Sequence, residues 1–400
     1  MIQLQDVIVA RQRIVGSVQH TPLSVSRSCS STLGAEVFLK YENQQTTGSF
    51  KIRGSLNKIL GLNEKDRAKG IIAASAGNHA QGVAFSAQRV GAKAIIVMPE
   101  NSPIVKVLAT QSYGAEVILH GKIYDDAYAH ARELEKKHGY TFVHPFDDDQ
   151  IIAGQGTLGL EVIEAIPDLD SIVIPIGGGG LISGVATAIK GIRPSCKVYG
   201  VVTEVSPGML QMFEKKPVDA PNSSLTIADG ISVKRPSERM YKDYISKLVD
   251  GVVAVSDDEI AESIVFFLER AKTVVEGSGA VSWAGACKAG WNLGKKSCLV
   301  LSGGNIDLNL VSKVIERGLT KKGRLIRLAV VVQDRPGNLN RLTSVIAEKG
   351  ANILDVKHDR VRLGLKMSET AIEFLLETRS ESHVGELKNA FLNLGARLIE

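Results

Sequence analysis

Four consecutive glycines at positions 177–180 are the strongest chemical signal in the sequence. They follow the apolar run Ile172–Ile176 and open a helical pattern that starts at Leu181. A glycine loop between a strand and a helix is an anion site, because free backbone N–H groups and the positive helix end face the ligand. A dinucleotide fingerprint would need a further glycine at position 182 or 183, which is absent. The loop therefore favours a monophosphate, held by Gly177, Gly178, Gly179, Gly180 and Leu181.

A lysine near the start of a helix is the second candidate. Ser49 is a plausible N-cap for a helical pattern whose first turn contains Lys51. The helix dipole disfavours a cation there, which lowers the pKa of the lysine and increases the fraction of neutral amine that can attack an aldehyde. Taken alone, Lys51 fits a solvated surface lysine better than a nucleophile.

Two further loops carry polar side chains at the ends of strands. The segment Ser75–His79 offers a hydroxyl and backbone amides that can bind a carboxylate or a phenolic oxygen, although Asn78 fits a turn residue equally well. His79 is expected to be structural, because no second ligand lies at a metal-binding spacing. Ser302–Asn305 places a hydroxyl and a glycine turn after another strand.

The elements that position these loops alternate between short β-branched runs and helical patterns. Such alternation predicts βαβ units in two parallel α/β layers, with a cleft where loops leave the carboxyl ends of strands. The first series has strands at 71–74, 94–98 and 116–119 and helices at 79–90, 103–111 and 125–138. The second has a helix from 156 to 166, strands at 171–175, 197–202 and 298–301, and a helix starting at 181.

The pattern changes after a basic segment at 317–327, where we place a domain boundary. Residues 326–332 alternate as a half-buried strand, 334–337 form a turn, and 339–349 read as a helix. Two more strands, a helix near 384–394 and a last short strand complete a ferredoxin-like β-α-β-β-α-β order. About 75 residues are too few for a second catalytic cleft.

Composition and charge exclude several classes of protein. The 400 residues carry 48 Lys and Arg against 43 Asp and Glu, a net charge of +5 without a basic stripe, so nucleic acid is not expected as a partner. The four cysteines lack C-x-x-C spacing and fit a reducing compartment. No run of about 18 apolar residues suits a membrane helix. A cytoplasmic protein is therefore expected.

Together the loops supply a monophosphate cradle, an amine nucleophile, a carboxylate loop and a hydroxyl for a ring, which are what pyridoxal 5'-phosphate requires. Over roughly residues 4–318 the chain resembles the threonine dehydratases, which are fold-type-II pyridoxal phosphate enzymes. The matching motifs are Lys40–Asn43, Thr47–Gly54, Ser75–Gly82, Gly177–Leu181, Ala228–Ile231 and Ser302–Asn305. The resemblance implies an α/β catalytic domain at 1–318, with a smaller lobe at about 40–150 inserted.

The same resemblance implies a role for each site residue. Lys51 is expected to carry the cofactor and then take the substrate's Cα proton, with Phe50 bordering the cofactor ring. Asn78 is expected at the 3-oxygen of the ring, Ser75 and Gly77 with Asn78 at the substrate carboxylate, and the glycine loop at the phosphate. Ser302 is expected at the pyridine nitrogen. A hydroxyl there cannot stabilise a pyridinium, which favours loss of a β-hydroxyl over transamination.

The implied reaction is elimination of water from L-threonine, and from L-serine, to give 2-ketobutyrate or pyruvate and ammonia. A serine dehydratase or racemase-like enzyme and a β-replacement enzyme remain alternatives. Racemases of this family carry a serine where this chain has Ala76. Their divalent-metal site maps to Glu204, Gly208 and Leu210, whose third position offers no ligand, so no metal is expected. Glu276, in a glycine-rich loop, is expected to be a surface glutamate.

Residues 325–400 resemble an ACT domain, an amino-acid-sensing module, through Asp334–Leu339 and Ala351–Ile353. The resemblance implies allosteric control by an amino-acid or nucleotide effector. Its site is expected where two copies meet, near Gly337, Asn338 and Leu339 and a facing Asn352. Regulation of this kind implies a homo-oligomer, a dimer or a tetramer. The sequence leaves open the preference for threonine or serine, the effector, and a biosynthetic or catabolic role.

Overall fold

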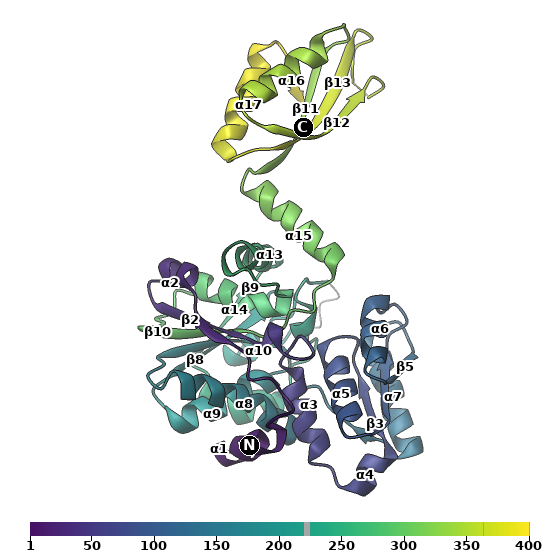
Figure 1. The fold of residues 1–400 in the computed structure, drawn as a ribbon, viewed down its shortest axis with the longest axis vertical. Coiled ribbons are helices and arrows are strands. Elements are labelled where there is room, and N and C mark those ends of the chain that lie inside the picture. Colours follow the sequence, from purple (N-terminus) through teal and green to yellow (C-terminus); the bar gives the residue numbers. More distant parts are fainter. Residues whose placement is uncertain (220–224, 363, 400) are drawn as a thin grey trace. The chain divides into compact units, whose positions relative to one another are not determined.

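The computed structural model describes residues 1–219, 225–362 and 364–399 and is drawn in Figure 1. The chain divides into two compact units, Met1–Asp307 and Leu308–Glu400. The division lies before the predicted boundary at 317–327, because Leu308–Lys321 forms helix α15, which contacts the first strand of the second unit.

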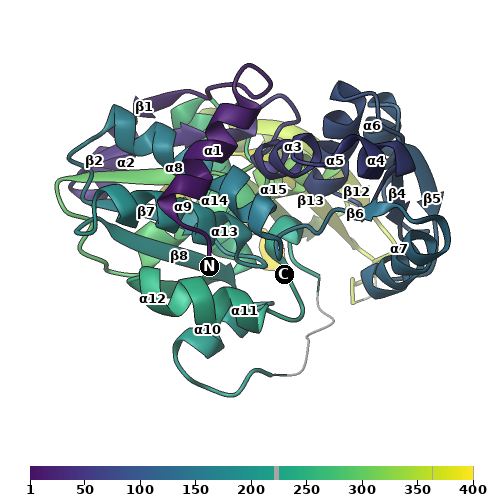
Figure 2. The same ribbon diagram turned by 90° about the horizontal axis from the view of Figure 1, so that it is seen from below.

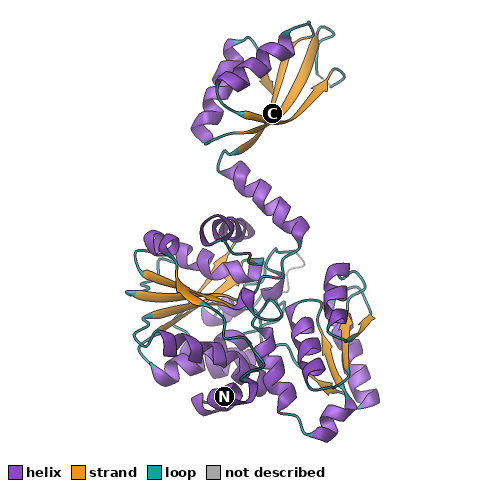
Figure 3. Cartoon of the chain, viewed as in Figure 1, coloured by secondary structure: helices purple, strands orange, loops and turns teal. Residues whose placement is uncertain are grey.

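A parallel four-stranded sheet forms the smaller lobe of the first unit, in the order β5-β4-β3-β6. Helices α5 and α6 pack on one face and α7 on the other, so both faces are buried, as Figure 3 shows. The predicted βαβ series is confirmed, and the first three strands begin and end where predicted. The elements are α3 (Lys51–Leu60), α4 (Glu64–Lys69), β3 (Ile71–Ala74), α5 (Asn78–Arg89), β4 (Ala94–Met98), α6 (Ile104–Ser112), β5 (Glu116–Leu119), α7 (Tyr124–His138) and β6 (Thr141–Phe142).

A six-stranded sheet forms the larger lobe, in the order β1-β2-β10-β7-β8-β9, and only β1 runs antiparallel to its neighbour. Figure 2 shows this sheet with its helices. The strands are β1 (Leu23–Val25), β2 (Glu36–Tyr41), β7 (Ser171–Pro175), β8 (Lys197–Thr203), β9 (Gly251–Val255) and β10 (Lys296–Leu301). The longer helices are α1 (Leu4–Ile14), α2 (Arg27–Leu33), α8 (Asp149–Ala165), α9 (Gly180–Ile192), α13 (Asp257–Phe266) and α14 (Gly277–Lys288).

Short helical segments connect these elements. They are η1 (Glu42–Gln44), α10 (Gly208–Phe213), η2 (Asp229–Ile231), α11 (Glu238–Met240), η3 (Tyr241–Ile245), α12 (Ser246–Leu248) and η4 (Phe267–Ala271).

Helices α8 and α9 lie backbone against backbone in the core of the larger lobe. A Cβ at residue 184 would lie 2.2 Å from the carbonyl oxygen of Ile152, and one at residue 156 would lie 2.7 Å from that of Gly184. Only glycine permits this approach. The glycines that suggested a helix start near Gly156 are therefore inside α8, which begins at Asp149 with Asp148 as its N-cap.

The second unit has the predicted β-α-β-β-α-β order. Its antiparallel sheet runs β12-β13-β11-β14, and the helices bury an apolar core that includes Phe374 and Phe391. The elements after α15 are β11 (Leu325–Gln333), α16 (Asn338–Glu348), β12 (Asn352–Asp359), β13 (Glu369–Glu377), α17 (Glu381–Asn393) and β14 (Arg397–Ile399).

A buried cluster of four charges ties α3 to the larger lobe. Arg53 lies two residues after Lys51, and its guanidinium is 2.8 Å from Glu42 Oε1 and 2.6 Å from Glu161 Oε1. Lys40 Nζ is 2.5 Å from Glu161 Oε2. Burial opposes the charge on Glu42, but the adjacent guanidinium holds the pKa of this carboxyl below its ordinary value. The cluster therefore fixes the start of α3 against β2 and α8.

Arg53→Ala should lower the free energy of unfolding by about 3–5 kcal/mol, because two buried carboxylates lose their main partner. Urea denaturation monitored by circular dichroism measures the effect. Arg11→Ala is the matched control, since Arg11 pairs with Glu164 on the surface, where the loss should stay within about 1 kcal/mol. A similar small loss for both variants would contradict the structural role of the cluster.

Candidate active site

Four loops that follow parallel strands meet in the first unit. They follow β2, β3, β7 and β10 and carry Lys51, Asn78, the four glycines and Ser302. The backbone joins two of them directly: Phe50 N–H donates to Ser302 O at 3.1 Å, and Ser49 forms an isolated antiparallel bridge with Gly303. The position agrees with the rule that ligands bind beyond the carboxyl ends of parallel strands.

Lys51 is the first residue of α3. Its Nζ donates to the carbonyl oxygen of Pro145 at 3.1 Å and lies 5.2 Å from the centre of the Phe50 ring. Burial lowers the pKa of Lys51 to about 8, against an opposing effect of Glu276. The predicted direction is right, but the cause is burial. The predicted N-cap is wrong: Phe50 occupies that position, and the buried Ser49 Oγ has no hydrogen-bond partner among the described residues.

A lysine with a pKa of about 8 should react with pyridoxal phosphate in an unusual pH range. Only the neutral amine attacks, so the rate of cofactor incorporation should rise about tenfold per pH unit and level off near pH 8. An ordinary lysine would level off at about 10.4. Stopped-flow absorbance with cofactor-free protein gives this profile. A rate that continues to rise through pH 10 would contradict the lowered pKa.

Asn78 begins α5 and takes part in two side-chain contacts. Its Nδ2 donates to Glu276 Oε1 at 2.6 Å, and its Oδ1 accepts from Asn305 Nδ2 at 2.8 Å. In the same loop, Gly77 N–H donates to Ser75 Oγ at 3.2 Å. His79 is buried, with Nε2 2.9 Å from Val143 O, as expected for a structural residue.

Glu276 is not the surface glutamate that the sequence suggested. It is 5% exposed and lies at the N-cap of α14. Burial, together with the nearby charge of Asp229, raises the pKa of Glu276 to about 7, although the hydrogen bond from Asn78 opposes the shift. One signal in the sequence could have indicated that Glu276 is buried: it precedes the small residues Gly277–Ala280, which let the start of this helix lie close to the other loops.

The glycine loop has no space for side chains. A Cβ at residue 178 would lie 2.2 Å from the ring of Phe146, and Gly179 has a φ of +94° at the N-cap of α9. The backbone N–H groups of residues 177–179 donate to no other group among the described residues. A helix start with free N–H groups is an anion site, so the loop fits the phosphate of the cofactor.

Ser302 is 2% exposed, and its hydroxyl donates to Ser278 O at 3.2 Å. The hydroxyl of Ser278 is also buried and has no hydrogen-bond partner within the described part of the chain. The site thus has free N–H groups at one loop, unpartnered hydroxyls at others and a lysine of lowered pKa. These groups fit pyridoxal phosphate, with its phosphate, pyridine nitrogen and aldehyde.

The predicted effector residues lie in the second unit and are only partly brought together. Gly337, Asn338 and Leu339 line a cavity of about 240 Å³ near His358 and Arg360. Asn352 does not line it: it begins β12, at the end opposite Asp359, and its Nδ2 is 3.4 Å from Glu377 Oε2.

The described residues contain neither a metal-binding cluster of side chains nor a helix suited to span a membrane. No group of three or more His, Cys, Asp and Glu side chains there is arranged to hold a metal, and Glu204 instead pairs with Lys288 at 2.8 Å. None of the helices described has the length and hydrophobicity of a bilayer span.

Comparisons with known proteins agree with this geometry. The family model described as pyridoxal-phosphate dependent enzyme matches residues 14–303. An L-threonine ammonia-lyase of Thermotoga maritima is 46% identical over 99% of this chain and 98% of the relative. A catabolic L-threonine dehydratase of Escherichia coli is 42% identical over 78% of this chain and 96% of its own.

Solved structures give the same result. A threonine deaminase isoform of Solanum lycopersicum is 37% identical over 78% of this chain and 86% of that chain, with a TM-score of 0.72. A maize serine racemase is 33% identical over 79% of this chain and 98% of that chain, with a TM-score of 0.73. The family model covers both lobes, and the Thermotoga maritima relative is 46% identical over nearly the whole of both chains. The chain therefore belongs to the pyridoxal-phosphate dependent enzymes.

Proposed function

We propose that this chain is a threonine ammonia-lyase that converts L-threonine to 2-ketobutyrate and ammonia, and L-serine to pyruvate and ammonia. Relatives with this name match it over nearly their whole length. One observation carries the proposal: a lysine whose pKa is lowered to about 8 stands among a free glycine loop, Asn78 and a buried serine hydroxyl.

In this proposal Lys51 has two tasks at one atom. Its neutral Nζ holds the cofactor and later takes the proton from the substrate's Cα. Pyridoxal phosphate, when bound, supplies an electron sink for the bond that breaks at Cα. The backbone N–H groups of Gly177–Leu181 hold the phosphate, and Phe50 borders the ring. Ser75, Gly77 and Asn78 orient the substrate carboxylate.

Ser302 decides which reaction follows proton removal. Its hydroxyl would hold the pyridine nitrogen of the bound cofactor without adding a negative charge, which would leave that nitrogen unprotonated. The electron pair at Cα would then be less delocalised, which would favour departure of the β-hydroxyl. The amino group leaves as ammonia after hydrolysis.

The decisive assay uses the full chain loaded with pyridoxal phosphate. Threonine should give 2-ketobutyrate and ammonia in equal amounts, and serine should give pyruvate and ammonia. Adding sulfide tests β-replacement, since cysteine would then form. Chiral analysis of remaining serine tests racemisation, for which Ala76 offers no hydroxyl.

We propose further that residues 325–400 form an ACT domain that regulates the enzyme in the cytoplasm. The β-α-β-β-α-β order supports the domain, and four free cysteines fit a reducing compartment. The cavity at Gly337–Leu339 is bordered by Arg335 and by Arg360, whose Nε pairs with Asp334 at 3.0 Å; guanidinium groups suit the carboxylate of an amino acid. Asn352 would join the same ligand only from a second copy, which fits a homo-oligomer.

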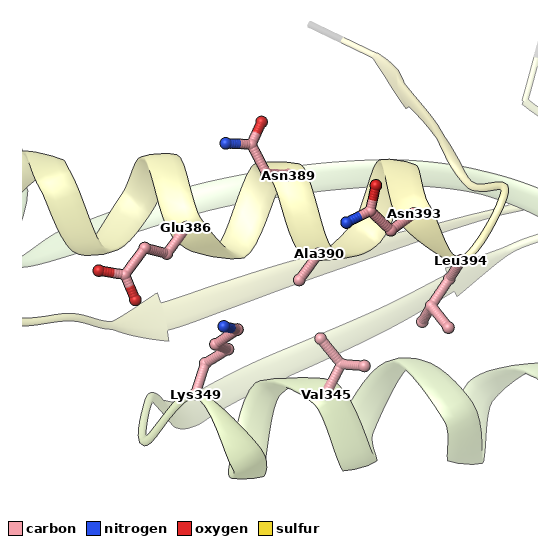
Figure 4. A pocket seen from close by; sticks show the side chains of 7 residues that line it. All are labelled: Val345, Lys349, Glu386, Asn389, Ala390, Asn393 and Leu394. Atoms are coloured by element: carbon pink, nitrogen blue, oxygen red, sulfur yellow. The ribbon is translucent and has the colours of Figure 1, made fainter.

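A second hollow in this unit was not predicted from the sequence. It has a volume of about 420 Å³ and lies between α16 and α17, as Figure 4 shows. Lys349 and Glu386 lie toward one end and Leu394 toward the other. None of the predicted effector residues lines it, so the proposal places the effector at the smaller cavity.

A chain ending at Arg324 should keep basal threonine turnover within about twofold and lose any response to an effector. The Escherichia coli relative supports the first part, since 316 aligned residues cover 96% of it. Isoleucine, valine and AMP are added to both chains, and the response of the full chain should lie at about 5- to 150-fold. Loss of activity on truncation, with no effector response in the full chain, would favour a scaffold role.

A further inference from the structure

A chain of hydrogen bonds links three of the active-site loops, those after β2, β3 and β10, to Glu276 at the start of α14. Asn305 Nδ2 donates to Thr47 O and to Asn78 Oδ1, each at 2.8 Å. Asn78 Nδ2 then donates to Glu276 Oε1 at 2.6 Å. These four residues lie on the loops after β2, β3, η4 and β10.

The chemistry of the first link fixes the direction of the others. A backbone carbonyl only accepts hydrogen bonds, so Asn305 must turn its NH₂ group toward Thr47. Both hydrogens of that group are then used, one by Thr47 and one by Asn78. Asn78 must therefore present its oxygen to Asn305 and its NH₂ group to the opposite side.

On that opposite side Asn78 has two hydrogens and one partner. Glu276 accepts the first. The second remains for an acceptor outside the chain, such as a phenolic oxygen. If the Asn78 amide turned over, two NH₂ groups would face each other at Asn305, and an oxygen would face the Glu276 carboxyl.

The surrounding backbone holds these side chains in place. A Cβ at residue 48 would lie 2.2 Å from Asn305 Oδ1, and Gly48 has a φ of +71°. A Cβ at residue 303 would lie 2.2 Å from Glu276 Oε1 and 3.2 Å from Asn78 Nδ2. Glycine backbone thus lies directly against both ends of the chain of hydrogen bonds.

We propose that Asn305 is a positioning residue: by orienting the amide of Asn78, it ensures that a hydrogen-bond donor faces the 3-oxygen of the cofactor. The proposal rests on the proposed function, which places Asn78 at that oxygen. A donor there favours the ionised oxygen, which gives the bound cofactor its long-wavelength absorption.

The test compares N305D, N305A and a control in the full chain loaded with pyridoxal phosphate. Aspartate keeps the shape of Asn305 but replaces its donor with an acceptor, whereas alanine leaves Asn78 free to adopt either orientation. N43D is the matched control: Asn43 Nδ2 donates to Val274 O and to Thr273 Oγ1, each at 2.8 Å, and among the described residues it makes no hydrogen bond to Asn78. Absorbance between pH 6 and 9 gives the spectroscopic pKa of the bound cofactor.

We expect the spectroscopic pKa to rise by about one unit or more in N305D and by less in N305A, with kcat lowered by about 10- to 100-fold in N305D. N43D should match the parent spectrum. If Asn305 only filled space, the spectroscopic pKa would shift more in N305A than in N305D, because aspartate has the shape of asparagine whereas alanine leaves a cavity. That reverse order, or a parent-like N305D spectrum, overturns the proposal.

A double-mutant cycle covers the case in which N305D does not fold. In the N78A background, N305A should leave the spectroscopic pKa unchanged, because Asn305 acts through Asn78. An equal shift in both backgrounds overturns the proposal. Failure of the proposed function has a different signature: the parent chain itself would bind no cofactor through Lys51.

Discussion

Lys51→Ala should lower threonine turnover by at least about 10⁴-fold, because the covalent attachment point and the Cα base are lost together. Of the lysines that the structure describes, only Lys51 lies at these loops with a pKa that burial lowers, to about 8. Formation of 2-ketobutyrate measures the loss, and the parent's absorption at about 410 nm should vanish with it.

Lys58→Ala is the control for the helix that carries Lys51. Lys58 lies in the same helix and pairs with Asp148 at 2.7 Å, away from the four loops. Its removal should leave turnover close to that of the parent. Near-normal 2-ketobutyrate formation by the Lys51→Ala protein would remove Lys51 from its proposed role.

Ser302→Asp should reduce elimination by at least about 100-fold, more than Ser302→Ala does. In the structure the hydroxyl donates to Ser278 O at 3.2 Å and is 2% exposed. A carboxylate there would face a carbonyl oxygen without a donor and would draw a proton onto the pyridine nitrogen. The electron pair at Cα would then be held longer, and transamination should rise relative to elimination.

Single-turnover experiments separate these outcomes, because 2-ketobutyrate reports elimination and pyridoxamine phosphate reports transamination. Ser302→Ala is the matched variant, since it removes the hydroxyl without adding charge. If the Ser302→Asp protein eliminates as fast as the parent, the role given to the neutral pyridine nitrogen is wrong.

Local sequence predicted the elements whose signals are local. Strands β3, β4, β5 and β7 begin and end where β-branched runs meet turn residues, and the confirmed series of the smaller lobe follows from their alternation with helices. Helix α14 escaped detection because Gly277–Lys288 is rich in small residues and buried almost all round, so it has no amphipathic period.

The site features that the sequence did not predict depend on contacts between segments that lie far apart in the chain. The role of Glu276 depends on Asn78, 198 residues away, and no neighbouring residue marks a glutamate as buried. The lowered pKa of Lys51 was expected from its own helix but comes from burial by other loops. Phe146 likewise explains why residue 178 must be glycine, although nothing near it in sequence indicates this.

The contact between α8 and α9 limits how the site can evolve. Helix α9 begins with the loop proposed to bind the phosphate, and the carbonyl oxygen of Ile152 occupies the place where residue 184 would carry a Cβ. Because the two helices touch through backbone atoms here, the substitution of a side chain cannot move α9 a small distance along α8. Adaptation to a bulkier anionic ligand would therefore have to come from the loop tip or from Phe146, which makes these positions the natural targets for redesigning cofactor preference.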